Sequence, residues 1–232
     1  MGNKEVNLKN GNLFIEKYIT QKMGGKKIEI TTKESSNLMK LIGWFLAAIQ
    51  INKTFMTNYI TTIGTTIYFP ENLLEEIAPK RFMEVIVHEC VHAVDEHNNK
   101  IIYKPTYLPE LFLGLPLLIS SIVLFVLKSW IAASIVLVLA LLCLLPVPKP
   151  GRYHWEIRAY STSLGIAHIF NEDKAYVNQI KRWICGQLAG SSYYFTWPFK
   201  DKILKDLEIN PREVQLYDET VAFFMKDFVE QV

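Results

Sequence analysis

A continuous apolar segment dominates the middle of the chain and limits how the rest can fold. Residues 111–146 contain one charged side chain, Lys128, in a background of leucine, isoleucine and valine. A soluble core helix does not need an apolar run of this length, whereas a bilayer-spanning segment does. We therefore expect this segment to be embedded in a membrane.

The length of the segment favours two crossings over one. A single helix over residues 111–146 would be about 54 Å long, much longer than a hydrocarbon core of roughly 30 Å. Residues 111–127 and 131–146 would each form a helix of about 25 Å, and the Lys-Ser-Trp tripeptide between them suits a turn at a lipid interface. The sequence thus predicts a transmembrane helical hairpin. The alternative is a buried hairpin in a large soluble core.

The charges around the hairpin indicate its orientation. Basic residues flank its base and one lies at its tip: Lys100, Lys104, Lys149 and Arg152, and Lys128. The excess at the base places both flanking parts in the cytoplasm by the positive-inside rule.

Composition excludes other classes of protein. Half of the 232 residues are hydrophobic, so the chain is not disordered, and a net charge of +2 argues against a nucleic-acid partner. Three cysteines, an odd number, imply no disulfide framework and slightly favour a reducing compartment. The first ten residues lead into no apolar stretch, so no cleavable signal peptide is expected.

Upstream of the hairpin, the residue pattern predicts a small α+β domain. A turn around Gly64 separates two β-branched and aromatic runs, and Pro79 suits the first turn of a helix. The expected elements are a strand over residues 27–32, a helix over 37–51, paired strands over 55–61 and 65–69, and a helix over 79–98.

The last of these helices contains the pattern His-Glu-x-x-His at residues 88–92. Residues four apart lie on the same helix face, so His88 and His92 can bind one metal ion, with Glu89 beside them to act on a water molecule. The helix is otherwise apolar except for a polar stripe: Arg81, Glu84, His88, His92 and Asp95. A divalent cation is a suitable partner for such a stripe, because burying these groups without partners costs several kcal/mol.

Two other residues of this helix are assigned from their position. Cys90 faces away from His88, so we expect it to pack in the core. Asp95 either orients a histidine or is a solvated residue at the helix end.

Glu156 is the candidate for a third metal ligand, because catalytic zinc usually has three protein ligands. Breaker residues at 146–151 end the apolar segment, and a new helix is expected from about Tyr153. Ala159, one turn after Glu156, would permit close approach to the histidine helix. His-Glu-x-x-His followed by Glu-x-x-Ala resembles the gluzincin metallopeptidases, whose third zinc ligand is a glutamate of a second helix. The alternative is a carboxylate favoured by the dipole of the first helical turn.

The resemblance covers about residues 27–97 and 153–170 and implies a small zincin-like domain with the hairpin inserted. This domain would contain a backing helix, a short antiparallel or mixed sheet, the histidine helix and the glutamate helix. Tyr160 stands where many gluzincins have an acidic residue that holds a ligand histidine. The expected division is residues 1–105 for the first part of the domain, 106–150 for the membrane hairpin and 151–232 for the helical remainder.

The activity implied is peptide-bond hydrolysis by a membrane-anchored zinc metallopeptidase. His88, His92 and Glu156 would hold Zn²⁺, and Glu89 would pass a proton from water to the leaving amine. A peptide or protein substrate near the bilayer would add as a strand along residues 65–69. The candidate donors to the oxyanion are Tyr193, Tyr194, Tyr160, His154 and His168. The Tyr193–Tyr194 pair is slightly favoured, although the aromatic stretch at 193–199 also fits a packed core or an interface belt.

Two other functions keep the same site. The zinc could be structural in a membrane-anchored scaffold without activity, or the hairpin could itself be a membrane-inserting element. The intact Glu89 favours an active peptidase. The part from Asn171 onward is expected to be helical, and the amphipathic residues 218–232, with Val221, Phe224, Met225 and Phe228 on one side, are expected to dock on the domain rather than on lipid.

Overall fold

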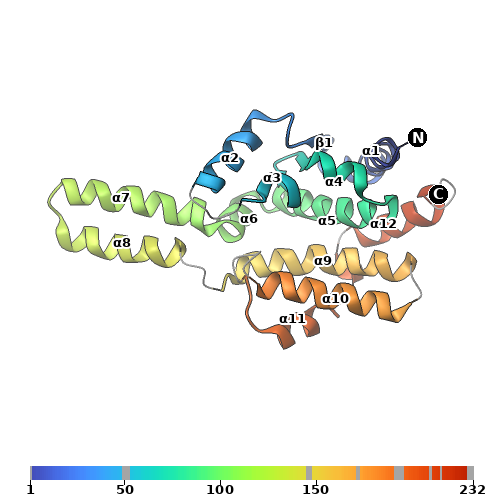
Figure 1. Ribbon diagram of the computed structural model, residues 1–232. Coiled ribbons are helices and arrows are strands. Elements are labelled where there is room, and N and C mark those ends of the chain that lie inside the picture. Colours follow the sequence, from blue (N-terminus) through green and yellow to red (C-terminus); the bar gives the residue numbers. More distant parts are fainter. Residues whose placement is uncertain are drawn as a thin grey trace. The chain divides into compact units, whose positions relative to one another are not determined.

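The computed structural model is mostly helical and contains one small mixed sheet, in agreement with the α+β expectation (Figure 1). It describes residues 2–48, 53–144, 148–170, 173–190, 196–208, 211–214 and 216–228. The chain divides into two compact units. The first unit is formed by Met1–His97, Ser161–Glu172 and Asn210–Val232, and the second by Asn98–Tyr160 and Asp173–Ile209.

The first unit contains a three-stranded sheet in the order β1-β3-β2. Its strands are β1 (Glu29–Thr32), β2 (Thr61–Ile63) and β3 (Thr66–Phe69). β3 runs parallel to β1 and antiparallel to β2, and Ile67 at its centre is fully buried. The expectation that a peptide adds along residues 65–69 is therefore wrong, because both edges of β3 are already hydrogen-bonded to neighbouring strands.

The predicted strand over residues 55–61 is helical in its first half. α3 (Phe55–Asn58) forms a single turn, in which the N–H groups of Thr57 and Asn58 donate to the carbonyl of Thr54 at 3.1 and 2.9 Å. The Nζ of Lys33 donates to the carbonyl of Phe55 at 2.7 Å and holds this turn from another part of the chain. The predicted turn at Gly64 is confirmed, with a φ of 62° that suits glycine.

Four longer helices complete most of the first unit. They are α1 (Asn3–Phe14), α2 (Asn37–Ala48), α4 (Glu71–Glu76) and α5 (Pro79–Asn98). The predictions for α2 and α5 are confirmed, except that residues 49–51 lie outside the described part of the chain. α1 approaches the sheet closely at Gly11, where an added Cβ would lie 2.8 Å from the Cδ1 of Ile30.

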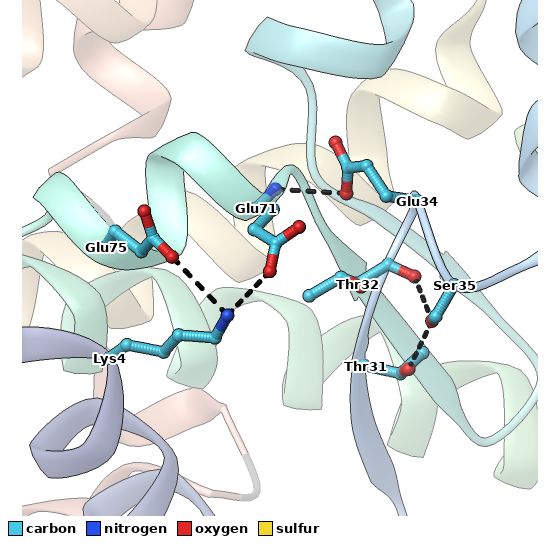
Figure 2. A network of polar contacts seen from close by, with 7 residues as sticks. All are labelled: Lys4, Thr31, Thr32, Glu34, Ser35, Glu71 and Glu75. Atoms are coloured by element: carbon cyan, nitrogen blue, oxygen red, sulfur yellow. Dashed lines mark hydrogen bonds and ion pairs between the residues drawn. The ribbon is translucent and has the colours of Figure 1, made fainter.

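Polar contacts fix α4 and the turn that follows β1 (Figure 2). The Nζ of Lys4 in α1 lies 2.7 Å from the Oε1 of Glu71, and Glu34 accepts the N–H of Glu71 at the start of α4 at 3.1 Å. Ser35 donates its hydroxyl to the carbonyl of Thr32 at 2.7 Å. These contacts hold the chain on either side of Lys33, whose side chain is fully buried.

The C-terminal helix docks on the first unit, as expected. It comprises α12 (Tyr217–Phe223) and a π-helical turn, η5 (Phe224–Phe228). Phe223 packs edge-on against Phe14 of α1 with 5.2 Å between ring centroids, and Phe224 is fully buried. Met225, which was expected on the buried side, is instead 63% exposed.

The second unit is helical. Its elements are α6 (Lys100–Tyr107), the π-helical turn η2 (Glu110–Gly114), α7 (Leu115–Val126), α8 (Trp130–Leu144), the first half of α9 (Pro150–Phe170), α10 (Lys174–Ala189) and α11 (Lys200–Asp206). The helix expected from about Tyr153 begins one turn earlier, at Pro150.

α7 and α8 lie side by side as the predicted helical hairpin (Figure 1). The chain reverses at Lys128, which has a φ of 60°, and the hydroxyl of Ser121 donates to the carbonyl of Ala133 at 2.9 Å between the two helices. Large apolar side chains point outward along both helices. Val126 in α7 is 74% exposed and Ile131 in α8 is 81% exposed.

No single helix among the described residues is both long and apolar enough to cross a membrane. One bent pair, Lys100–Tyr107 with Phe112–Val126 at 96°, meets these criteria jointly, and Asn37–Ala48 and Trp130–Cys143 are shorter apolar helices.

Candidate metal centre

α5 presents the two predicted histidine ligands on one face. His88 and His92 are one helical turn apart, and both are buried, at 8% and 5% exposure. Their Nε2 atoms lie 3.1 Å apart, with the two rings nearly perpendicular at 82°. Both imidazoles therefore direct the same nitrogen toward a common point.

Glu156 of α9 joins the histidines. The ligand atoms of His88, His92 and Glu156 all lie within 4.8 Å of one another, and Glu156 is 1% exposed. The structure thus brings together the three residues that the sequence predicted as metal ligands, and this buried group could bind a metal ion.

The donor set fits a divalent cation, and zinc in particular. Two imidazole nitrogens and one carboxylate are a common protein ligand set for catalytic zinc. Two nitrogens bound to a tetrahedral zinc at about 2.0–2.1 Å would be about 3.3 Å apart, close to the 3.1 Å between the Nε2 atoms of His88 and His92. A cation would also balance the buried carboxylate of Glu156, whose burial is otherwise costly.

Glu89, the expected general base, is held by the sheet. The hydroxyl of Thr62 in β2 donates to the Oε2 of Glu89 at 2.6 Å. Lys33 also interacts electrostatically with Glu89. Burial lowers the pKa of Lys33 to about 8, and the carboxylates of Glu34 and Glu89 oppose this lowering. Neither Thr62 nor Lys33 was identified from the sequence.

Tyr107 is a further contact of the site that sequence reasoning missed. Its hydroxyl donates to the Oε1 of Glu156 at 2.5 Å. Burial, and then the neighbouring carboxylate of Glu156, raise the pKa of Tyr107 well above its ordinary value, so it remains a hydrogen-bond donor. The available signal was the hairpin itself, because Tyr107 lies before it and Glu156 after it, and a hairpin brings its two flanks together at its base.

The base of the hairpin carries a group of ion pairs. Arg152 donates to both oxygens of Glu110 at 3.2 and 3.0 Å, and Lys149 also binds Glu110. Lys149 and Arg152 are two of the four basic residues on which the predicted orientation depends, and both are buried. The other two, Lys100 and Lys104, are exposed, and the prediction of a cytoplasmic base rests on them.

Cys90, Glu84 and Asp95 of α5 are also buried. Cys90 is fully buried and burial raises the pKa of its thiol, so its expected packing role is confirmed. Asp95 is buried, which contradicts the alternative of a solvated residue at the helix end. Burial also raises the pKa of Glu84, against the effect of Arg81, and the Glu84 carbonyl accepts the hydroxyl of Ser163 in α9 at 2.9 Å.

The oxyanion donors expected from the sequence fall into two groups. Tyr193 and Tyr194 lie outside the described residues, so their role stays a prediction. Of the other three, His154 and His168 are exposed, and Tyr160 is buried with its ring 6.3 Å from that of Trp183.

An α+β chain with a buried group of two histidines and one glutamate is the class that the fold and the site define. No protein-family model, characterised protein or solved structure matches the chain. A function for this chain is therefore inferred from the geometry of the site.

Proposed function

We propose that this protein is a zinc metallopeptidase of the gluzincin type, anchored in a membrane by the α7–α8 hairpin. The observation that carries the proposal is the approach of His88, His92 and Glu156, whose ligand atoms lie within 4.8 Å of one another next to Glu89. The two histidines and Glu89 come from one helical turn, and the third ligand comes from a distant helix.

Zinc bound by these residues would lower the pKa of a water molecule and polarise a peptide carbonyl. Glu89 stands next to His88 on α5, and its carboxylate is oriented by the hydroxyl of Thr62 at 2.6 Å. In this position Glu89 accepts a proton from water and then donates it to the amine that leaves. Tyr193 or Tyr194 remains the proposed donor to the oxyanion.

The substrate strand is proposed to pair with β2 in place of β3. β2 is an edge strand, so one side of its backbone is available to an added strand within the described sheet. Thr62 of β2 contacts Glu89, and a peptide paired with this strand would pass close to the general base. The substrate class is therefore an extended peptide segment of a protein near the membrane.

Membrane anchoring is supported by the surface of the hairpin. Side chains such as Ile122 and Ile135, on α7 and α8, are each 58% exposed, and an apolar surface of this extent is unfavourable in water. A lipid bilayer would cover these side chains. The base of the hairpin, with Lys100 and Lys104, would face the cytoplasm.

The test combines zinc analysis with proteolysis of a peptide library. Glu89→Gln removes the general base without removing a metal ligand, so we expect it to retain one zinc per chain and to lose cleavage by at least 100-fold. Glu76→Gln, which changes an exposed carboxylate of α4, serves as the matched control and should behave as the wild type.

Three outcomes would overturn the proposal. If the purified wild type contains no bound metal, the assignment as a zinc enzyme is refuted. If wild type and Glu89→Gln cleave equally, the assignment of Glu89 as general base is refuted. Zinc binding without cleavage of any peptide would instead favour the scaffold with a structural zinc.

A further inference from the structure

A chain of contacts in the second unit runs from the start of the apolar hairpin to the third metal ligand. Its members are Glu110, Arg152, Tyr107 and Glu156, which lie within or next to η2, α6 and α9. Glu110 and Tyr107 precede the hairpin in the sequence, and Arg152 and Glu156 follow it. The α7–α8 hairpin is thus tied at its base by side chains that come from both of its ends.

The link closest to the metal is the hydrogen bond from Tyr107 to Glu156. The Tyr107 hydroxyl lies 2.5 Å from the Oε1 of Glu156 and defines how this carboxylate is rotated. Carboxylates that bind metals are commonly held in this way, and loss of the outer partner weakens metal binding.

Tyr107 is itself held on three sides. Its ring stacks on that of Tyr103 with 5.2 Å between centroids and 9° between planes, and the guanidinium of Arg152 lies over it at 5.7 Å. The Nε of Arg152 donates to the carbonyl of Tyr107 at 2.8 Å. The phenol therefore has little freedom to leave Glu156 while Arg152 stays in place.

Arg152 is fixed in turn by the hairpin. Its Nη2 lies 3.0 Å from the Oε2 of Glu110, the first residue of the π-helical turn that leads into α7. A second tie between the two ends lies close by, where the indole N–H of Trp155 donates to the hydroxyl of Thr106 at 3.0 Å. Any displacement of the hairpin relative to α6 and α9 would move these contacts.

We propose that Tyr107 is a positioning residue for Glu156 and that it couples metal affinity to the base of the α7–α8 hairpin. This inference rests on the proposed function, because it takes Glu156 as a metal ligand. It adds that the hairpin influences metal affinity as well as anchoring the protein. A rearrangement at its base would reach the metal through Arg152 and Tyr107, so zinc would be held most tightly when the hairpin is correctly seated.

The first experiment measures zinc affinity by competition with a chelator, using the purified full-length chain. Tyr107→Phe removes only the hydroxyl, and we expect a zinc Kd that is 10- to 100-fold higher than that of the wild type. The matched control is Tyr153→Phe, because Tyr153 also donates its hydroxyl to a carboxylate at 2.7 Å, and this carboxylate belongs to Asp206, which is not one of the proposed metal ligands. This control should keep the wild-type Kd.

A spectroscopic measurement separates positioning from a loss of stability. Cobalt(II) bound in place of zinc absorbs visible light according to its ligand geometry, so Tyr107→Phe should change this spectrum and Tyr153→Phe should not. Glu110→Gln, which leaves Tyr107 and Glu156 intact, should raise the zinc Kd by a smaller factor, about 3- to 10-fold. This second variant keeps the coupling testable if Tyr107→Phe does not fold.

The outcomes distinguish this inference from the proposed function. A wild type that binds no zinc overturns both. A wild type that binds zinc, together with Tyr107→Phe or Glu110→Gln proteins that bind it with unchanged Kd and an unchanged cobalt spectrum, overturns only the coupling.

Discussion

At the scale of single residues, Glu89 and Lys33 of the first unit each have a defined hydrogen-bond partner. Thr62 holds the carboxylate of Glu89, and Lys33 is buried between β1 and α3, where its Nζ donates to the carbonyl of Phe55. Such groups are costly to bury, so each contact should be measurable when one partner is removed.

Replacing Thr62 by valine keeps the shape of the side chain and removes the hydrogen bond to Glu89. A hydrogen bond to a charged group contributes about 1.5–3 kcal/mol, so we expect peptide cleavage to fall by about 10-fold or more at unchanged zinc content. Thr62→Ser should restore most of the rate. Thr61→Val, on the opposite face of the strand, is the control, and an equal loss in that variant would contradict the assigned role.

Lys33 makes stability depend on pH. Its pKa falls from 10.5 to about 8 on folding because it is buried, so between pH 8 and 10.5 the unfolded chain binds more protons at this residue than the folded chain. The free energy of unfolding should therefore rise through this window, by about 3 kcal/mol. Below pH 8 the cost of burying the charge is fully present.

The measurement is thermal unfolding at several pH values in wild type, Lys33→Met and Lys40→Met. The rise should disappear in Lys33→Met, and it should persist in Lys40→Met, which changes an exposed lysine of α2. A Lys33→Met protein with the same pH dependence as the wild type would refute the assignment.

At the scale of elements, local patterns predicted those parts of the fold that have strong periodicity. α5 was predicted with both of its ends, because its apolar residues and Pro79 act locally. α3 was missed because Lys33, distant in sequence, holds the carbonyl of Phe55, and the central place of β3 was missed because it depends on the parallel pairing with β1. Neither contact leaves a signal in the neighbouring residues.

The contact between α6 and α9 gives a test at this scale. A Cβ added at Gly151 would lie 2.6 Å from the Cβ of Thr106 and 2.7 Å from its carbonyl oxygen, closer than packing allows. Gly151→Ala should therefore lower stability by about 1–3 kcal/mol. Gly186→Ala in α10 meets nothing within 4 Å and should raise stability by about 0.5–1 kcal/mol, because alanine is the better helix former. Thermal unfolding of both variants measures the difference, and equal shifts would contradict the close approach.

At the scale of the whole molecule, the sequence predicted the three residues of the candidate metal centre but not the residues that contact them. His88 and His92 follow from helical spacing, and Glu156 follows from its place in a second motif. Tyr107 was missed because it lies 49 residues from Glu156, on the other side of the apolar segment. The hairpin separates the two residues in sequence, and because it reverses the chain it also brings them together at its base.

The proposed anchoring can be tested by flotation. Wild-type chain synthesised with liposomes should float with them, and the double variant Ile122→Asp and Ile135→Asp should lose at least 10-fold in the floating fraction, because each charge at mid-bilayer costs about 2.5–3.5 kcal/mol. Met225→Asp, which alters an exposed residue of the docked C-terminal helix, should float like the wild type. Wild-type chain that remains at the bottom of the gradient would refute the anchoring.

The most direct test of the central claim is anomalous diffraction at the zinc edge from crystals of the zinc-loaded protein. We predict one peak per chain at about 2.0–2.2 Å from the Nε2 atoms of His88 and His92 and from a carboxylate oxygen of Glu156. The absence of a peak, or a peak that Glu156 does not reach, would contradict the metal centre on which the proposed activity depends.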